Sequence, residues 1–458
     1  MEKETKSFKC MACRAFDSKW IQILGDCPAV DECLKKKKGC CWNLLNFYNC
    51  FARGLSQIAF ANNPITGTLV LLALFAASPT VGVGGLVGAS VSVLTAMAFG
   101  IQKPLITSGL TTYNGALVGI ITTSLLPLLY SKPVTLYVWM FIIFGASLSV
   151  IINSCIDNLF SSSQKNVLPP LTLTFNAIQL LMFVCLMSSN ASEQEHGATV
   201  QDISTKTQET YPIPTSNSSA TALFSHQNSA KHIFAFPKKL PPYRKRTYTL
   251  GVSGHSAADW SRSGVGFAIG VVLSVGQVHG LNDLWASVII MLGIFIYSPI
   301  HLVTGIIGAG LGSTCGILLA NEDFDDVYNG LWGYNGFLAS VAISSIFFLP
   351  SIRSFIVAGA NVVTAALVQK AFQLGFKQLN LPYLTVPYVL TTLIFLQAKV
   401  KDGSPIRIKN ISYPEKHLYE HYVGMRKDSS PHKDQEMSCD ACRSTSNAGK
   451  SQTILTPE

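Results

Sequence analysis

The chain has 458 residues, of which 48% are hydrophobic and 13% charged, with a mean hydropathy of +0.34 and a formal net charge of +9. That charged fraction is about half of what soluble domains carry, and between residues 54 and 187 the charged side chains are Lys103, Lys132, Asp157 and Lys165. Because a soluble fold of that length could not cover its surface with these four charges, the composition excludes a soluble protein and predicts an integral membrane protein.

Residues 1–45 are polar and are expected to form a cytosolic N-terminal segment. Four lysines at positions 35–38 precede Cys40 and Cys41, and juxtamembrane cysteines beside basic residues are typical of S-palmitoylation sites. Basic residues next to membrane segments indicate contact with anionic lipid of the bilayer, so we expect no nucleic-acid partner. The Cys-x-x-Cys pairs of both tails lack further ligands nearby, and no metal site or cofactor is predicted.

Two apolar blocks follow, at residues 46–187 and 263–398, and each can hold several spans of about 20 residues. In the first block, prolines divide the sequence into predicted spans near 54–77, 80–101, 104–130, 134–155 and 167–187. In the second block, where some segments are expected to cross only half of the membrane, the predicted spans are 265–281, 284–298, 299–320, 330–350, 354–374 and 381–398. Since isolated helices satisfy their own backbone in lipid, the expected class is an all-α membrane protein.

Residues 188–262, between the blocks, are rich in Ser, Thr, Asn and Gln and contain five prolines, which predicts a long polar loop. Glycosylation sequons begin at Asn190 and Asn217 in this loop. The loop is too long for its basic residues to set the topology. We therefore expect it to be extracellular, with the N-terminal segment and the tail at residues 399–458 in the cytosol.

The two blocks read as repeats of one unit. The Leu-Pro-x-Leu-Thr sequence at residues 168–172 recurs at residues 381–385, so that Thr172 and Thr385 are 385 − 172 = 213 positions apart. Further pairs recur at offsets of 220 or 221, namely Gln57 and Gln277, Ser78-Pro79 and Ser298-Pro299, Gly85-x-x-Gly88 and Gly305-x-x-Gly308, and residues 109–117 and 330–338. A near-constant offset indicates a duplicated unit. About five spans per unit, an odd number, predict inverted repeats with a pore at their interface, built in part by half-spanning helices.

The candidate pore-lining residues occupy matched positions, and none is ionisable near neutral pH: Gln57, Gln277, Thr172, Thr385, Tyr113, Leu117, Tyr334 and Leu338. Ion-coupled carriers usually carry ionisable groups within the membrane, so a neutral lining favours a small neutral solute. A single membrane Thr more often bonds its own helix, and a single Gln a neighbouring helix. The repetition of both threonines within one Leu-Pro frame favours the pore instead.

These motifs resemble those of the eukaryotic urea transporter family. The family's repeated Leu-Pro-x-x-Thr-x-Pro-Phe motif resembles residues 168–175 and 381–388, and its Gln followed by an Asn-Asn-Pro turn resembles Gln57 with Asn62-Asn63-Pro64. Residues 324–335 look like the segment before the family's second pore helix. The resemblance covers about residues 45–187 and 263–420.

The resemblance implies a homotrimer in the plasma membrane, with two inverted repeats and a pore in each protomer. It implies passive conduction of urea or close analogues, and no enzymatic activity. Gln57 and Gln277 would lie at the ends of the selectivity filter, and Thr172 and Thr385 would face its middle. Tyr113 with Leu117, and Tyr334 with Leu338, would form walls along the plane of urea.

Three positions depart from the family pattern: Thr174 and Leu284 replace prolines, and Tyr388 replaces phenylalanine. Thr174 and Leu284 each restore a backbone N–H that proline lacks. This change affects the geometry of the expected filter, and with it the rate and selectivity. Two alternatives stay open, a channel for another neutral solute such as water or ammonia, and a membrane scaffold or receptor with a sealed pore.

Overall fold

The computed structural model describes residues 24–36, 39–162, 168–188, 260–319, 324–397 and 405–428. Within these ranges the chain is helical, has no strand, and forms one isolated antiparallel bridge between Phe348 and Arg407. The chain divides into two compact units, Met1–Leu186 with Phe267–Glu458, and Met187–Gly266. In the second unit the described residues are the end of one helix and the first turns of the next.

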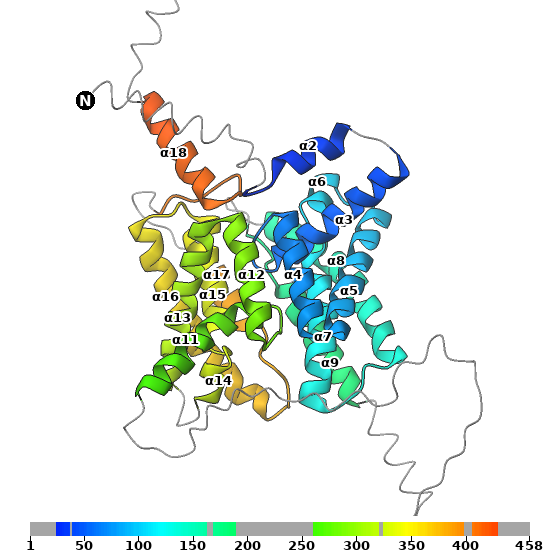
Figure 1. The fold of residues 1–458 in the computed structure, drawn as a ribbon, viewed down its shortest axis with the longest axis vertical. Coiled ribbons are helices and arrows are strands. Elements are labelled where there is room, and N and C mark those ends of the chain that lie inside the picture. Colours follow the sequence, from blue (N-terminus) through cyan, green and yellow to red (C-terminus); the bar gives the residue numbers. More distant parts are fainter. Residues whose placement is uncertain are drawn as a thin grey trace, which may run out of the picture. The chain divides into compact units, whose positions relative to one another are not determined.

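The first half of the chain runs from blue to blue-green in Figure 1. Its helices are α2 (Pro28–Lys36), α3 (Cys40–Gln57), α4 (Pro64–Ala77), α5 (Pro79–Ala98), α6 (Lys103–Thr107), α7 (Tyr113–Tyr130), α8 (Leu136–Ser162) and α9 (Leu173–Ser188). The second half runs from green to orange. Its helices are α11 (Trp260–Gln277), α12 (Leu284–Tyr297), α13 (Pro299–Leu319), α14 (Asp325–Tyr328), α15 (Gly333–Val341), the π-helix η1 (Ala342–Phe347), α16 (Ile352–Lys377), α17 (Val386–Phe395) and α18 (Pro414–Asp428).

Among the described helices, five are long and apolar enough to cross a membrane: α5, α7, α13 and α16 over their full lengths, and α8 over Leu136–Ser161. Shorter apolar helices accompany them in both halves, including α4, α12, α15 and α17. Many large apolar side chains on these helices are exposed, as lipid-facing residues would be. The architecture is that of an all-α membrane protein, as the composition predicted.

Two predicted spans are broken in the structure. The segment expected at 54–77 is two helices, because Asn63 caps α4 by accepting from the N–H groups of Ile65 (2.8 Å) and Thr66 (3.3 Å), with Pro64 in the first turn. The helix before this break, α3, starts as early as Cys40. The segment expected at 104–130 is likewise divided, into α6 and α7.

The second half repeats these breaks with other residues. Asp283 caps α12 by accepting from the Ala286 N–H at 2.8 Å, so Leu284 begins this helix although it lacks the proline of its counterpart. The segment expected at 330–350 changes from α-helix to π-helix at Ala342 and ends at Phe348 in an extended conformation. In the first half, α7 continues without such a change through Pro127.

Close helix pairs in both halves depend on glycine. Helix α5 packs against α7, and α13 packs against α15. A Cβ atom on Gly88 would clash with the carbonyl oxygen of Gly115, and a Cβ atom on Gly308 would clash with the Gly336 carbonyl and with Ser340. The glycines that recur in the sequence are therefore packing positions at matched helix crossings.

The two halves contact each other through α4 and α12, which lie side by side near the centre of Figure 1. The Thr66 hydroxyl donates to the Gly293 carbonyl at 2.6 Å across this contact. Ser124 of α7 donates to the Gly280 carbonyl at 2.6 Å, and His301 Nε2 lies 2.9 Å from the Ala59 carbonyl oxygen. Each half thus anchors the loop that precedes α4 or α12 in the other half.

Candidate functional site

Thr172 and Thr385, 213 positions apart in sequence, meet in the interior. Their hydroxyl oxygens are 2.8 Å apart, and the two residues are 4% and 6% exposed. Thr172 directly precedes α9 and Thr385 directly precedes α17, so both stand at matched helix starts. The shared Leu-Pro frame brings the two motifs to one point between the halves.

Both threonines follow a leucine in the left-handed backbone region. The φ angle of Leu171 is +50° and that of Leu384 is +48°. A left-handed conformation costs an L-residue about 1–2 kcal/mol, so it persists only where surrounding contacts impose it. Tyr113 supplies such a contact by donating its hydroxyl to the Leu171 carbonyl at 2.6 Å, and Tyr334 donates in the same way to the Leu384 carbonyl.

These contacts place two of the predicted wall residues, Tyr113 and Tyr334, next to the leucines that precede the threonine pair. Tyr113 and Tyr334 are buried, their hydroxyls are engaged by backbone, and the Tyr334 ring stacks on Tyr383 with 6.2 Å between centroids. Leu117 and Leu338, one turn along α7 and α15, are each 1% exposed and belong to the hydrophobic core. All four residues occur at matched positions of the two halves.

The predicted terminal residues of the filter also have equivalent bonds. Gln57, at the end of α3, donates from Nε2 to the Ser108 carbonyl at 3.0 Å. Gln277, at the end of α11, donates from Nε2 to the Asn329 carbonyl at 2.9 Å. Both Gln residues are partly exposed, and each keeps its amide oxygen outside these bonds.

The two halves differ in the hydrogen bonds of Asn114 and Asn335, the asparagines that directly follow Tyr113 and Tyr334. Asn114 donates to Asn153 Oδ1 at 2.9 Å, and Thr174 also contacts that oxygen, at 3.3 Å. In the second half Asn335 donates to Gln369 Oε1 at 2.8 Å. The hydroxyl of Thr174, which stands where the family has proline, therefore forms a hydrogen bond that proline could not form.

Three residues near the threonines were not predicted as parts of the site. Phe60 has φ +61°, the conformation that Gly280 adopts at the matching position, and its ring packs edge-on against Tyr388 and Phe347 at 6.4 and 6.2 Å between centroids. Asn176 contacts both threonines. The Tyr388 hydroxyl oxygen lies 3.3 Å from Thr172 Oγ1. In the sequence, Tyr388 is recognisable only as a departure from the motif of the family that the chain resembles. Nothing in the sequence indicates a role for Phe60 or Asn176.

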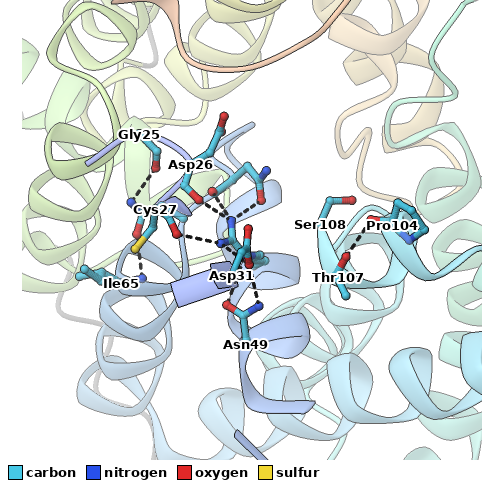
Figure 2. A network of polar contacts seen from close by, with 12 residues as sticks. Gly25, Asp26, Cys27, Asp31, Asn49, Ile65, Pro104, Thr107 and Ser108 are labelled. Carbon is cyan, nitrogen blue, oxygen red and sulfur yellow. Dashed lines mark hydrogen bonds and ion pairs between the residues drawn. The ribbon is translucent and has the colours of Figure 1, made fainter. Parts of the chain in front are cut away.

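A buried arginine holds the turn between α3 and α4, close to Gln57. The Arg53 side chain is 1% exposed and pairs with Asp31 at 3.1 Å. It donates to the carbonyl oxygens of Asp26 (2.9 Å) and Asn62 (2.7 Å), and to Asn49 Oδ1 at 3.2 Å. Figure 2 labels three of these partners, Asp26 from the segment before α2, Asp31 from α2 and Asn49 from α3.

Of the two predicted kinds of modification site, the structure describes the palmitoylation sites but not the glycosylation sites. Cys40 and Cys41 are exposed at the start of α3. Asn190 and Asn217 lie outside the described residues. Among the described residues, no group of three or more His, Cys, Asp or Glu side chains could hold a metal ion.

Comparison with known proteins identifies the family. The urea transporter family matches residues 48–238 and 230–400. The chain belongs to the urea transporter family. It is 28% identical to Urea transporter 1 of Ovis aries over 398 residues, which is 86% of this chain and 87% of that protein. It is 29% identical to Urea transporter 1 of Mus musculus over 396 residues, with the same coverage of both chains.

Proposed function

We propose that this member of the urea transporter family is a passive channel that conducts urea down its concentration gradient. The filter runs between two inverted repeats, from Gln57 to Gln277, with Thr172 and Thr385 at its middle. Tyr113 with Leu117, and Tyr334 with Leu338, form its walls. The observation that carries the proposal is the meeting of the two threonines from matched motifs in a buried, uncharged environment.

The chemistry of urea suits such a lining. Urea is flat and carries four N–H donors and one carbonyl acceptor, so it needs several hydrogen-bond partners when it leaves water. Hydroxyl oxygens can both accept and donate, and apolar or aromatic walls fit its faces while giving hydrated ions no replacement for their water. The eight proposed lining residues include no ionisable group that titrates near neutral pH, which supports uncoupled movement.

Removal of either central hydroxyl tests the proposal. We expect Thr172→Val and Thr385→Val to lower urea permeability by about 10- to 100-fold, since an unpaired polar group costs about 1–3 kcal/mol in a desolvated site. The measurement is radiolabelled urea uptake in oocytes, normalised to protein at the cell surface. Thr314→Val is the matched control, because Thr314 is exposed on α13 and bonds its own helix at 2.8 Å. Unchanged uptake in both filter variants would contradict the assigned role.

The same assay separates the alternative functions. Uptake of water or thiourea without urea would favour a channel for another neutral solute. Equal flux of all solutes in expressing and control oocytes would favour a scaffold or receptor with a sealed pore and would refute conduction.

We further propose a homotrimer in the plasma membrane with both termini in the cytosol. Family membership supports this assembly, and the sequons at Asn190 and Asn217 support an extracellular loop. Cys40 and Cys41 are proposed palmitoylation sites, supported by their exposure beside the lysine run. Glycosidase sensitivity that persists in Asn190→Gln/Asn217→Gln protein would contradict the loop sites. Chemical cross-linking tests the trimer, and acyl exchange on Cys40→Ser/Cys41→Ser protein tests the lipid anchor.

A further inference from the structure

A cavity of about 580 Å³ lies between α13 and α16, and none of the eight proposed filter residues lines it. Its walls come mainly from residues 299–311 of α13 and 355–362 of α16, the N-terminal parts of two membrane-crossing helices. Leu418 of α18 also lines it, and Glu415 of α18 accepts from the Ile300 N–H at 3.0 Å. The stretch on α13 corresponds to about 18 Å along the helix axis, close to the roughly 15 Å of hydrocarbon in one leaflet.

The cavity is wide because small side chains replace large ones at this place in the second half. Asn153 of α8 and Gln369 of α16 accept matching hydrogen bonds from α7 and α15, so the two helices correspond at an offset of 369 − 153 = 216. At this offset Ala358-Gly359, in the cavity wall, correspond to Ile142-Ile143. Ile142 is fully buried in the core of the first half. The second half therefore leaves open a volume that isoleucine side chains occupy in the first.

The polar groups in the cavity wall are already satisfied by the protein. Thr304 Oγ1 donates to the His301 carbonyl at 3.0 Å and contacts Ser345 Oγ at 2.7 Å. Ser340 Oγ donates to the Thr304 carbonyl at 2.8 Å. Since a bound water needs two to four polar partners, these walls suit hydrocarbon better than water.

The cavity is continuous with the surface that faces lipid. Val303, Ile307 and Phe355 line it and are themselves well exposed on the two membrane-crossing helices. Arg353, in the first turn of α16, is exposed and forms no ion pair with the part of the chain that the structure describes. A basic side chain at the end of a membrane helix reaches the headgroup layer, where it can bind phosphate.

We propose that this cavity is a lipid site, which holds an acyl chain of a phospholipid from the leaflet on the side of α18. The chain lies along the first turns of α13 and against α16, and Arg353 binds the phosphate of the headgroup. A sterol would suit the apolar walls but offers no anion to the guanidinium. The site does not depend on which solute the proposed filter conducts.

Photolabelling from within the bilayer tests the site. The full chain is reconstituted in phosphatidylcholine vesicles that contain a trace of phosphatidylcholine with a diazirine on one acyl chain, and labelled residues are located by mass spectrometry after irradiation. Thr304 and Val362 line the cavity and are 4% and 1% exposed, so a chain must enter the cavity to label them. We expect label on both residues, with the label on exposed lipid-facing residues as the internal reference.

Filling the cavity should remove this label. A Cβ on Gly359 would meet Leu311 Cδ2 at 3.9 Å, an ordinary contact, so the helix has room for a side chain there. We expect Gly359→Ile to lower the label on Thr304 and Val362 by about 10-fold, the loss expected when roughly two methylenes are no longer buried. Gly359→Leu carries the same expectation and is measured beside it. Gly375→Ile is the matched control, because Gly375 is exposed on the same helix and a Cβ there would meet nothing within 4 Å.

The headgroup contact is tested by Arg353→Gln. We expect this variant to lower the label on the two cavity residues by about 2- to 5-fold, the range for an exposed ion pair. Equal labelling in Arg353→Gln and the wild type would overturn the contact with phosphate.

Absence of label on Thr304 and Val362 in the wild type would overturn the site. Equal labelling in the wild type and in the Gly359 variants that reach the vesicles would do so as well. A diazirine-bearing sterol that labels both residues where the phospholipid does not would assign the cavity to a sterol instead. Loss of cross-linked oligomers in Gly359→Ile, with no phospholipid label in the wild type, would assign it to a second copy of this chain.

Discussion

Arg53 shows how a single buried residue can hold the loop beside the proposed filter. Its guanidinium reaches Asp31, Asn49 and two backbone carbonyl groups, that of Asp26 before α2 and that of Asn62 before α4. A planar group with five donors can serve partners in several directions, whereas an ammonium group offers three donors from one point. The position matching Arg53 in the second half is Leu273, so this support belongs to the first half.

We therefore expect Arg53→Lys to destabilise the protein although it keeps the charge. The loss should be about 1–3 kcal/mol, because carbonyl oxygens of the backbone and of the Asn49 side chain would lose their donor. The measurement is the thermal midpoint of detergent-solubilised protein, followed by fluorescence-detected size exclusion. Arg353→Lys is the control, since Arg353 is exposed at the start of α16. Equal midpoints for the two variants would show that the Arg53 contacts contribute little.

Among single residues, the sequence predicted which threonines belong together but only some of their neighbours. The offset of 213 marked Thr172 and Thr385 because the repeat preserves their frame. Phe60 could not be recognised, because its left-handed conformation and its contact with Tyr388 depend on tertiary packing. Asn176 was missed for a similar reason, since its bonds to Thr385 cross between motifs that are remote in sequence.

Among the helices, the paired contacts between α5 and α7 and between α13 and α15 set how closely the backbones approach. Gly308 faces Gly336 and Ser340 across one of these contacts, whereas a Cβ on Gly310 of the same helix would meet nothing within 4 Å. The two glycines are two residues apart and so lie on different faces of α13.

Alanine substitutions on α13 should separate packing from helix propensity. We expect Gly308→Ala to lower stability by about 1–3 kcal/mol through overpacking. Gly310→Ala should be neutral or stabilising by up to about 1 kcal/mol, because alanine is the better helix former. Thermal midpoints in one detergent provide the comparison, and a Gly308→Ala midpoint at or above that of Gly310→Ala would contradict the packing.

The apolar periodicity located the helices but not all of their interruptions. The break before α4 depends on the side chain of Asn63 capping a helix, a contact that hydrophobicity does not encode. The change to π-helix at Ala342 also escaped prediction, because α7 carries a matching sequence and stays regular. In polar flanks, where apolar patterning gave no indication, α2 forms in contact with α3, and α18 forms in contact with α13.

Across the whole molecule, the segments near the two ends of the chain meet beside the loops of both halves. Gly25 donates its N–H to the Tyr297 carbonyl at 3.2 Å, and Asp26 accepts from the Ser412 hydroxyl. Glu415 accepts from the Ser298 hydroxyl at 2.8 Å, at the junction of α12 and α13. Burial raises the pKa of the Asp26 carboxyl above its usual 3.8, although Ser412 and Lys416 act in the opposite direction.

A raised pKa means that the folded protein binds the Asp26 proton more tightly than the unfolded chain does. The stability that this proton contributes is present at low pH and is lost as the pH rises through the folded pKa. We therefore expect Asp26→Asn to have a higher thermal midpoint than the wild type at pH 8, since Asn can still accept from Ser412. The advantage should shrink as the pH is lowered toward the usual value of 3.8.

Asp31→Asn provides the contrast, because it removes the carboxylate that pairs with Arg53 at 3.1 Å and should lower the midpoint at pH 8. A lower midpoint for Asp26→Asn at pH 8 would contradict a carboxylate whose charge is unfavourable there.

The contact between Thr172 and Thr385 also has a consequence for biosynthesis. The two residues are separated by 213 positions, and chains are synthesised at about 5–20 residues per second. The first threonine and the Asn176 carboxamide therefore leave the ribosome roughly 10 to 40 s before their partner exists. During that interval the first half holds an incomplete polar site within the membrane. The proposed filter is consequently a late product of translation, because its second threonine is residue 385 of 458.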